Sequence, residues 1–184
     1  MSATRAQRGA AMDVWTAVST KRAIRQFDPR PLEPEPLERI LHAGRHAGSS
    51  KNLQRWDFVV CREREHLRDL AKVGPWAAHL AGAAVGVALV TPDPGHADSP
   101  FSVMFDLGQA AENMMLVAWE LGIGSVPATV YEHDRARDLL GYPEDRHCEY
   151  ILSFGYPADS EVLSAPPKPG GRRSLEDVVH WEHW

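Results

Sequence analysis

Two groups of basic residues, far apart in the chain, are the first candidates for chemistry. The first group comprises Lys21, Arg22 and Arg25, and the second comprises Arg172 and Arg173 in a glycine-rich stretch near the C-terminus. A charge-assisted hydrogen bond to phosphate contributes about 1.5–3 kcal/mol. Three or four of these side chains, brought together by folding, would hold a small phosphorylated ligand; kept apart, they would be ordinary solvated cations. The spacing alone leaves both interpretations open.

A polar stretch, GSSKNLQRW at residues 48–56, is the second candidate. It offers the hydroxyls of Ser49 and Ser50, the carboxamide of Asn52 and the flat ring of Trp56. Such groups suit the polar edge and the face of a heterocycle. The same composition is also typical of a plain loop before a strand, so the pattern by itself does not decide.

Common catalytic motifs are absent from the sequence. The GxG at residues 122–124 follows a predicted helix, whereas a dinucleotide fingerprint follows a strand and opens a helix. GxxxxGK[ST], HExxH and GxSxG do not occur. The closely spaced pairs His42/His46 and His180/His183 lack a supporting third ligand, so surface or interface histidines are the better interpretation. Neither a covalent hydrolase nor a metalloenzyme is indicated, and we expect no metal.

Composition limits the class of protein. The 184 residues are 43% hydrophobic and 24% charged, which excludes a disordered chain, a collagen and a disulfide scaffold. The formal net charge of −5 argues against binding nucleic acid through its phosphates. Cys61 and Cys148 stand far apart with no CxxC, which favours two buried, reduced thiols. No apolar run is long enough to cross a membrane and no secretory signal is apparent. We therefore expect a cytoplasmic protein.

Helices and about four strands alternate along the chain, which predicts a sheet covered on both faces. Residues 1–11 are expected to form a flexible tail, and residues 12–184 a single domain. The segment 101–121 is apolar on nearly every side, which indicates a central helix buried partly by a second subunit. Helices are predicted over 14–20, 36–47, 63–73, 101–121 and 134–140, strands over 56–61, 82–90, 125–131 and 149–154, and an amphipathic turn over 175–184.

These segments together resemble the FMN-dependent nitroreductase family in its short, single-domain form. Residues 21–27, KRAIRQF, are similar to the family's R-R-S-x-R-x-F, and residues 47–56, AGSSKNLQRW, to its A-P-S-x-x-N-x-Q-P-W. Residues 105–124 resemble the central helix and the turn after it. Residues 151–157, ILSFGYP, resemble a strand ending in G-Y-P, and residues 172–184 the basic C-terminal motif. Five similarities in the family's order identify the chain as a member.

The resemblance implies an α+β fold with a mixed central sheet covered by helices, in an intertwined homodimer with two FMN sites at its interface. By position, Lys21 and Arg22 would hold the flavin phosphate, and Arg25 would approach the N1/O2 edge of the ring. A cation there stabilises the reduced, anionic flavin. Arg172 and Arg173 would complete the phosphate site.

Other positions of the family's site would fall elsewhere in this chain. The resemblance implies that Ser49, Ser50 and Asn52 reach the flavin from the partner subunit. It also implies that the stretch Pro127-Ala128-Thr129 lies against the isoalloxazine near N5. Trp56 and Phe105 are candidates for an apolar cover over the flavin. Four other tryptophans are expected in the core or the dimer interface: Trp76, Trp119, Trp181 and Trp184.

The chain departs from the family pattern at four positions. Ala23 replaces a serine that would give the phosphate a hydroxyl donor. Lys21 replaces an arginine and exchanges a planar fork for a point charge. Gly48 and Arg55 replace two prolines, so the loop is expected to be less rigid, with Arg55 extending toward the substrate channel.

The function implied is a flavin-dependent oxidoreductase. It would move two electrons from NADH or NADPH to a small organic acceptor (a nitroaromatic, a quinone or similar) by ping-pong hydride transfer, with flavin N5 and no side chain carrying the chemistry. Three alternatives stay open: a flavin oxidase or dehydrogenase acting on a natural metabolite, a related enzyme using a deazaflavin, and a flavin-binding module without NAD(P)H turnover. A membrane or nucleic-acid partner is not expected.

Overall fold

A computed structural model describes residues 12–96, 101–166 and 171–184. Its four strands form one sheet in the order β1-β2-β4-β3, and all three pairings are antiparallel. A parallel contact occurs at a single bridge, where Ala23 runs beside Ser125. The expected mixed sheet is therefore antiparallel in its named strands. Their bounds are β1 (Asp57–Cys61), β2 (Val85–Pro92), β3 (Gly124–Thr129) and β4 (Arg146–Gly155).

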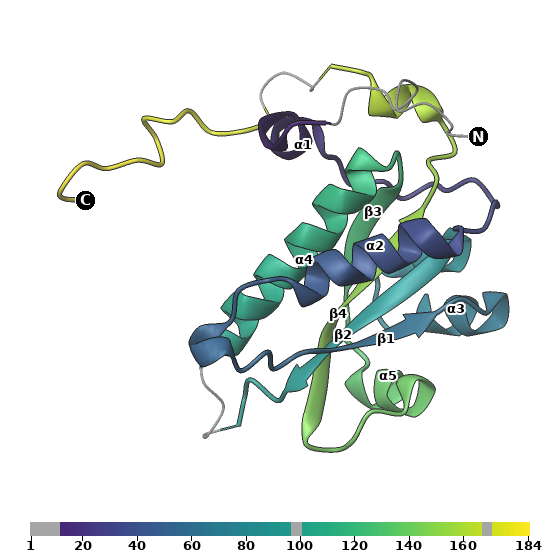
Figure 1. The fold of residues 1–184 in the computed structure, drawn as a ribbon. Coiled ribbons are helices and arrows are strands. Elements are labelled where there is room, and N and C mark those ends of the chain that lie inside the picture. Colours follow the sequence, from purple (N-terminus) through teal and green to yellow (C-terminus); the bar gives the residue numbers. More distant parts are fainter. Residues whose placement is uncertain (1–11, 97–100, 167–170) are drawn as a thin grey trace, which may run out of the picture.

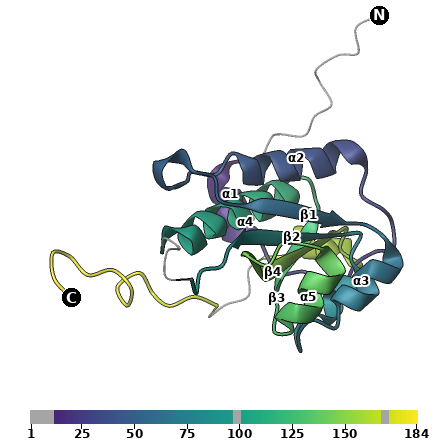
Figure 2. The same ribbon diagram turned by 90° about the horizontal axis from the view of Figure 1, so that it is seen from below.

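Helices cover both faces of this sheet, which confirms the α+β class (Figure 1). Viewed from below, α2 and α4 lie on one side of the strands, and α3 and α5 lie on the other (Figure 2). The helices are α1 (Val14–Thr20), α2 (Pro34–Arg45), α3 (Arg64–Leu70), α4 (Ser102–Glu120) and α5 (His133–Leu140), with short 3-10 turns η1 (Ser50–Asn52), η2 (Ala78–Gly82) and η3 (Ser160–Leu163).

Strand β2 is the centre of two hydrophobic cores. Its side chains alternate between the faces, so Val87 packs with α2 and α4 while Ala88 packs with α3 and α5. Every residue from 85 to 91 is buried, as the apolar run in the sequence predicts. Full burial of one Val or Leu side chain contributes about 1.5–3 kcal/mol. The cores thus hold the sheet and its helices as one body.

Local signals in the sequence explain where the helices begin. Asp13 caps α1, because its carboxylate accepts hydrogen bonds from the Thr16 backbone N–H at 3.0 Å and the Thr16 hydroxyl at 2.6 Å. Helix α2 begins at Pro34, two residues earlier than predicted, because proline suits the first turn of a helix.

The prediction for helix α4 is confirmed in part. Ala110, Met114 and Ala118 are buried against the sheet, and Trp119 is buried near its end. Phe105, however, is 73% exposed and Phe101 fully so. These two aromatic side chains are therefore not covered by the described parts of the chain, whereas Val103 between them is buried.

The segment 171–184, called the C-terminal arm below, extends away from the body (Figures 1 and 2). It contains no helix or strand. A turn does form within the predicted stretch 175–184, because the Val178 and Val179 N–H groups donate to the Leu175 carbonyl, but its apolar side chains do not pack: Leu175, Val178, Trp181 and Trp184 all lie more than half exposed.

The two cysteines are buried and free, as predicted. Burial raises the pKa of the Cys61 thiol to about 11 and that of Cys148 to about 12. Both therefore stay protonated and unreactive at neutral pH.

Among the residues that the structure describes, none of the helices has the length and hydropathy to cross a bilayer. The tail predicted over residues 1–11 lies outside the described residues.

Candidate functional site

Residues 21–27 lie directly on the edge of the sheet. The backbone N–H of Ile24 donates to the Ser125 carbonyl at 3.0 Å, which fixes the segment beside β3. This approach needs glycine at two positions. A Cβ at Gly124 would stand 2.6 Å from the Cβ of Ile24, and one at Gly155 would stand 2.8 Å from the ring of Phe27. The two glycines therefore hold the basic segment against the strands.

Arg25 projects from this segment over a pocket of about 500 Å³. The pocket is also lined by Gln26, Trp76, His79 and Pro127. The Arg25 side chain is exposed and has no carboxylate or hydrogen-bond partner within the described parts of the chain. A free guanidinium above a pocket offers a fork of donors to an anionic or carbonyl edge of a ligand.

His79 forms the buried wall of the same pocket and was not predicted from the sequence. Its Nδ1 lies 2.7 Å from the Ser153 hydroxyl. Burial lowers the pKa of His79, and the positive charge of Arg25 lowers it further, while a hydrogen bond with the Pro127 backbone opposes the shift. The imidazole is therefore neutral at pH 7. A lone histidine in the apolar stretch 77–83 gives no local signal of this position.

Lys21 and Arg22 already have partners in the single chain. The Lys21 ammonium lies 3.6 Å from a Glu112 carboxylate oxygen. The Arg22 guanidinium donates to the Val162 carbonyl at 3.1 Å and also to the Ala165 carbonyl, and so holds the segment after η3. Binding of a phosphate by these two residues would have to compete with those contacts.

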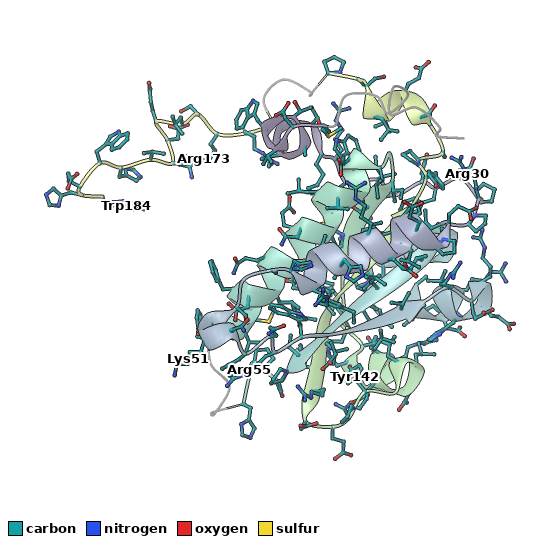
Figure 3. The ribbon with its side chains drawn as sticks, in the orientation of Figure 1. Arg30, Lys51, Arg55, Tyr142, Arg173 and Trp184 are labelled. Carbon is teal, nitrogen blue, oxygen red and sulfur yellow. The ribbon has the colours of Figure 1, made fainter. Side chains whose placement is uncertain are left out.

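Arg172 and Arg173 do not form a common site with Lys21 and Arg22 in the single chain. Both lie exposed on the C-terminal arm, where Arg173 donates to the Asp177 carbonyl (Figure 3). The four residues predicted to hold phosphate are thus not assembled within one chain.

The predicted polar loop has a strained backbone. Lys51, Asn52 and Gln54 have φ of 52°, 56° and 49°, in the left-handed region that costs most L-residues about 1–2 kcal/mol. The Ser49 hydroxyl accepts from the Gln54 backbone N–H at 3.0 Å, and the Ser50 N–H donates to Asp106 at 2.9 Å. Such strain tends to concentrate at binding sites.

Helix α4 separates this loop from the basic segment. Asp106, which holds Ser50, is near the start of the helix, whereas Trp119 near its end donates to the Thr20 hydroxyl at 2.9 Å. At about 1.5 Å per residue the two positions stand about 20 Å apart along the axis. Figure 3 shows Lys51 and Arg55 at the end of the molecule away from Arg30. One chain does not bring the loop and Arg25 together.

The sequence profile of the Nitroreductase family matches residues 18–85 and 72–156. The chain belongs to this family. A protein of Archaeoglobus fulgidus named "Putative NADH dehydrogenase/NAD(P)H nitroreductase" is 33% identical, over 91% of this chain and 96% of its own. Membership in the Nitroreductase family supports a general oxidoreductase role.

Solved structures show the same fold. A protein of Parabacteroides distasonis, also named "Putative NADH dehydrogenase/NAD(P)H nitroreductase", superposes with a TM-score of 0.80 at 22% identity, over 92% of this chain and 98% of that one. An "FMN-dependent Nitroreductase" of Clostridium difficile gives 0.79 at 23% identity, over 91% and 98%. The nitroreductase fold predicted from the sequence is confirmed.

Pro127, Ala128 and Thr129 lie on β3, an edge strand of this nitroreductase fold. An edge position tolerates proline, which has no N–H to donate. Pro127 is exposed to the pocket, whereas Ala128 is 1% exposed and packs in the second core. Ala128 can therefore contact a ligand in this pocket only through its backbone.

The aromatic candidates occupy different places. Trp56 is buried in the first core and lines a separate pocket of about 480 Å³ beside α2. Trp119 is a core residue, as predicted. Trp76, Trp181 and Trp184 are largely exposed, so in one chain they are not in the core, and the predicted interface role remains for them.

Proposed function

We propose that this member of the Nitroreductase family is an FMN-dependent oxidoreductase. It would pass two electrons from NADH or NADPH to a small organic acceptor, such as a nitroaromatic or a quinone. The observation that carries the proposal is the free guanidinium of Arg25 above a pocket bounded by Pro127 and neutral His79. The names of the Archaeoglobus and Clostridium proteins point to the same chemistry. Such a reaction suits the cytoplasm, where nicotinamide cofactors are supplied.

The residues of the pocket fit a flavin. Arg25 would hold the polar edge of the ring with its unpaired donors, and exposed Pro127 would present an apolar surface with no N–H to its face. Bound FMN would supply the two-electron redox chemistry that side chains lack. His79 stays neutral, so Arg25 provides the positive charge at this pocket. Charge placed there favours a negatively charged ring edge.

The phosphate would be held by residues 21–22 with help from the arm. Lys21 and Arg22 lie four and three residues before Arg25 on the same segment, and their present partners are a half-exposed Glu112 and two backbone carbonyls. The Glu112 side chain is 46% exposed and that of Lys21 21%, so solvent screens part of this ion pair, and a phosphate would replace one anionic partner of Lys21 with another. Arg172 and Arg173 of the partner's or the same chain's arm would add to the site.

We further propose that the working form is a homodimer. Apolar side chains are exposed both on the body and on the C-terminal arm, and a monomer rarely leaves such surface uncovered. A second copy would cover them and bring the loop of Ser49, Ser50 and Asn52 to the Arg25 pocket of its partner. The exposed side chains include Val14, Trp15, Phe101, Phe105, Leu175, Trp181 and Trp184.

The test is the visible absorption spectrum of the purified protein, before and after anaerobic NADH or NADPH. A flavin band that bleaches with one nicotinamide supports the reductase and names its donor. A band that stays favours the oxidase or the binding module. A colourless protein that takes up no FMN contradicts the proposal.

A pair of variants makes this test specific to the site. Arg25→Gln should weaken FMN binding by about tenfold or more, because a hydrogen bond to a charged group is lost. The matched control is Arg135→Gln, which removes another exposed arginine on α5 and should leave FMN affinity unchanged.

A further inference from the structure

His133, His147 and Glu149 form a cluster outside the pocket of Arg25. The His147 Nε2 lies 2.9 Å from Glu149 Oε2, and His133 Nε2 lies 4.0 Å from the same oxygen. One ligand atom from each residue lies within 4.8 Å of the other two. Among the described residues these three form the single group of this kind. We propose that they bind one divalent transition-metal ion of the zinc class.

The backbone brings these residues together from two elements. His147 and Glu149 are on β4, where the pairing with β2 skips from Tyr150 to Cys148 and leaves Glu149 as a bulge. A bulge turns a side chain away from its regular direction. His133 starts α5, and the preceding Val130 N–H donates to the Glu149 carbonyl at 2.9 Å. The site therefore joins the start of α5 to the start of β4.

The ligand set and its spacing suit zinc. Imidazole nitrogen and carboxylate oxygen bind Zn²⁺ at about 2.0–2.2 Å, which sets neighbouring ligand atoms about 3.3 Å apart in a tetrahedral site. The distances from Glu149 Oε2, 2.9 Å to His147 Nε2 and 4.0 Å to His133 Nε2, lie below and above that value. The side chains of His133, His147 and Glu149 are 39%, 19% and 29% exposed, so an ion and a completing water can enter.

The charges around the cluster favour a cation. A bound cation would meet two imidazole nitrogens and the carboxylate of Glu149, which supplies an opposite charge. Two arginines close in sequence to the cluster have carboxylate partners of their own, since Arg137 pairs with Asp134 at 3.7 Å and Arg146 with Asp145 at 3.9 Å. The His133 Nδ1 is buried with no hydrogen-bond partner among the described residues, so no neighbour locks the ring against turning toward an ion.

The experiment is calorimetric titration of the metal-free full chain with ZnCl₂. We expect one site per chain that is lost in the double variant His133→Ala/His147→Ala, with affinity at least about 100-fold weaker, since loss of an outer-shell partner alone costs 10–100-fold. The matched control is His42→Ala/His46→Ala, which removes two exposed histidines at the end of α2 whose rings are 6.4 Å apart. This control should bind zinc like the parent.

A thermal measurement guards against a variant that fails to fold. Glu149→Gln keeps the shape of its side chain and should retain the Tm of the metal-free parent, yet lose the rise in Tm that zinc produces. The flavin spectrum should not change on adding zinc, because none of the three residues lines the pocket of Arg25. Zinc binding that survives loss of both histidines, or disappears in the α2 control, overturns the proposal.

Discussion

The backbone N–H of Ser50 donates to a buried carboxylate oxygen of Asp106, 2.9 Å away. Asp106 is only 7% exposed, although it stands on a helix that is otherwise apolar on its inner side. The contact fixes the strained polar loop to the start of α4. A buried acidic side chain is thus explained by the loop that it holds.

Asp106→Ala should loosen this loop. Loss of a hydrogen bond to a charged group is expected to lower the free energy of unfolding by about 1.5–3 kcal/mol, measured by urea denaturation. FMN affinity should fall with it, because Ser49, Ser50 and Asn52 lose their position. Asp106→Asn keeps an acceptor oxygen, so its free energy of unfolding and its FMN affinity should lie between those of the parent and of Asp106→Ala. Equal stability of parent and alanine variant would refute this role.

Lys51→Gly should stabilise the protein. Lys51 is exposed with φ of 52°, where glycine avoids the strain of a Cβ. Relief of about 1–2 kcal/mol, less the entropy cost of glycine, leaves a gain of about 0.5–1 kcal/mol and a Tm higher by about 1–4 °C. Lys51→Ala removes the same side chain and keeps the strain, so it serves as the control. A glycine variant no more stable than the alanine variant would show that the loop is not strained.

Gly124→Ala should displace the segment that carries Arg25. The new methyl group would meet the Ile24 Cβ at 2.6 Å, and that atom cannot move without its backbone. We expect a loss of about 1–3 kcal/mol in stability and weaker FMN binding. Gly82→Ala is the matched control, since a Cβ there meets nothing within 4 Å, and it should change stability by less than about 0.5 kcal/mol. Both are measured by urea denaturation and flavin fluorescence, and unchanged binding in the first variant would contradict the argument.

His79 should make stability depend on pH. Its pKa in the folded protein is below the usual 6.5, because of burial and then Arg25. The unfolded chain therefore takes up the proton first, and stability from this residue is present above pH 6.5 and lost as the pH falls through its folded pKa. His79→Gln should flatten the decline in the free energy of unfolding between pH 7.5 and pH 5, whereas exposed His42→Gln should not. A ring titration by NMR in Arg25→Gln should show the pKa of His79 raised toward its ordinary value.

Local patterns in the sequence were sufficient to predict where the helices and strands form. The apolar run of β2, the cap at Asp13 and Gly122 with its positive φ after α4 each act within a few residues, so their effects could be read directly. The strand order could not be predicted in this way, because it depends on contacts between distant segments. The sheet that the family resemblance implied as mixed is antiparallel in all three strand pairings.

Residues of the candidate site could be predicted only where they belong to a sequence motif of the family. Arg25 and Pro127 follow from the resemblance, and the structure places both on one pocket. Asp106, His79 and the cluster at His133 were missed because each makes its contact with a residue far away in sequence or across a bulge. A single charged or aromatic residue in an apolar helix or strand does not show which distant group it meets.

The length of α4 has a genetic consequence. In a symmetric dimer, each pocket would take Arg25 from one copy and the polar loop from the other, because the helix keeps the two apart within a chain. Arg25→Gln and Asn52→Ala would then each weaken FMN binding in both pockets of a homodimer. A mixed dimer of the two carries both defects in one pocket and none in the second, so co-expression of the two alleles restores activity by complementation.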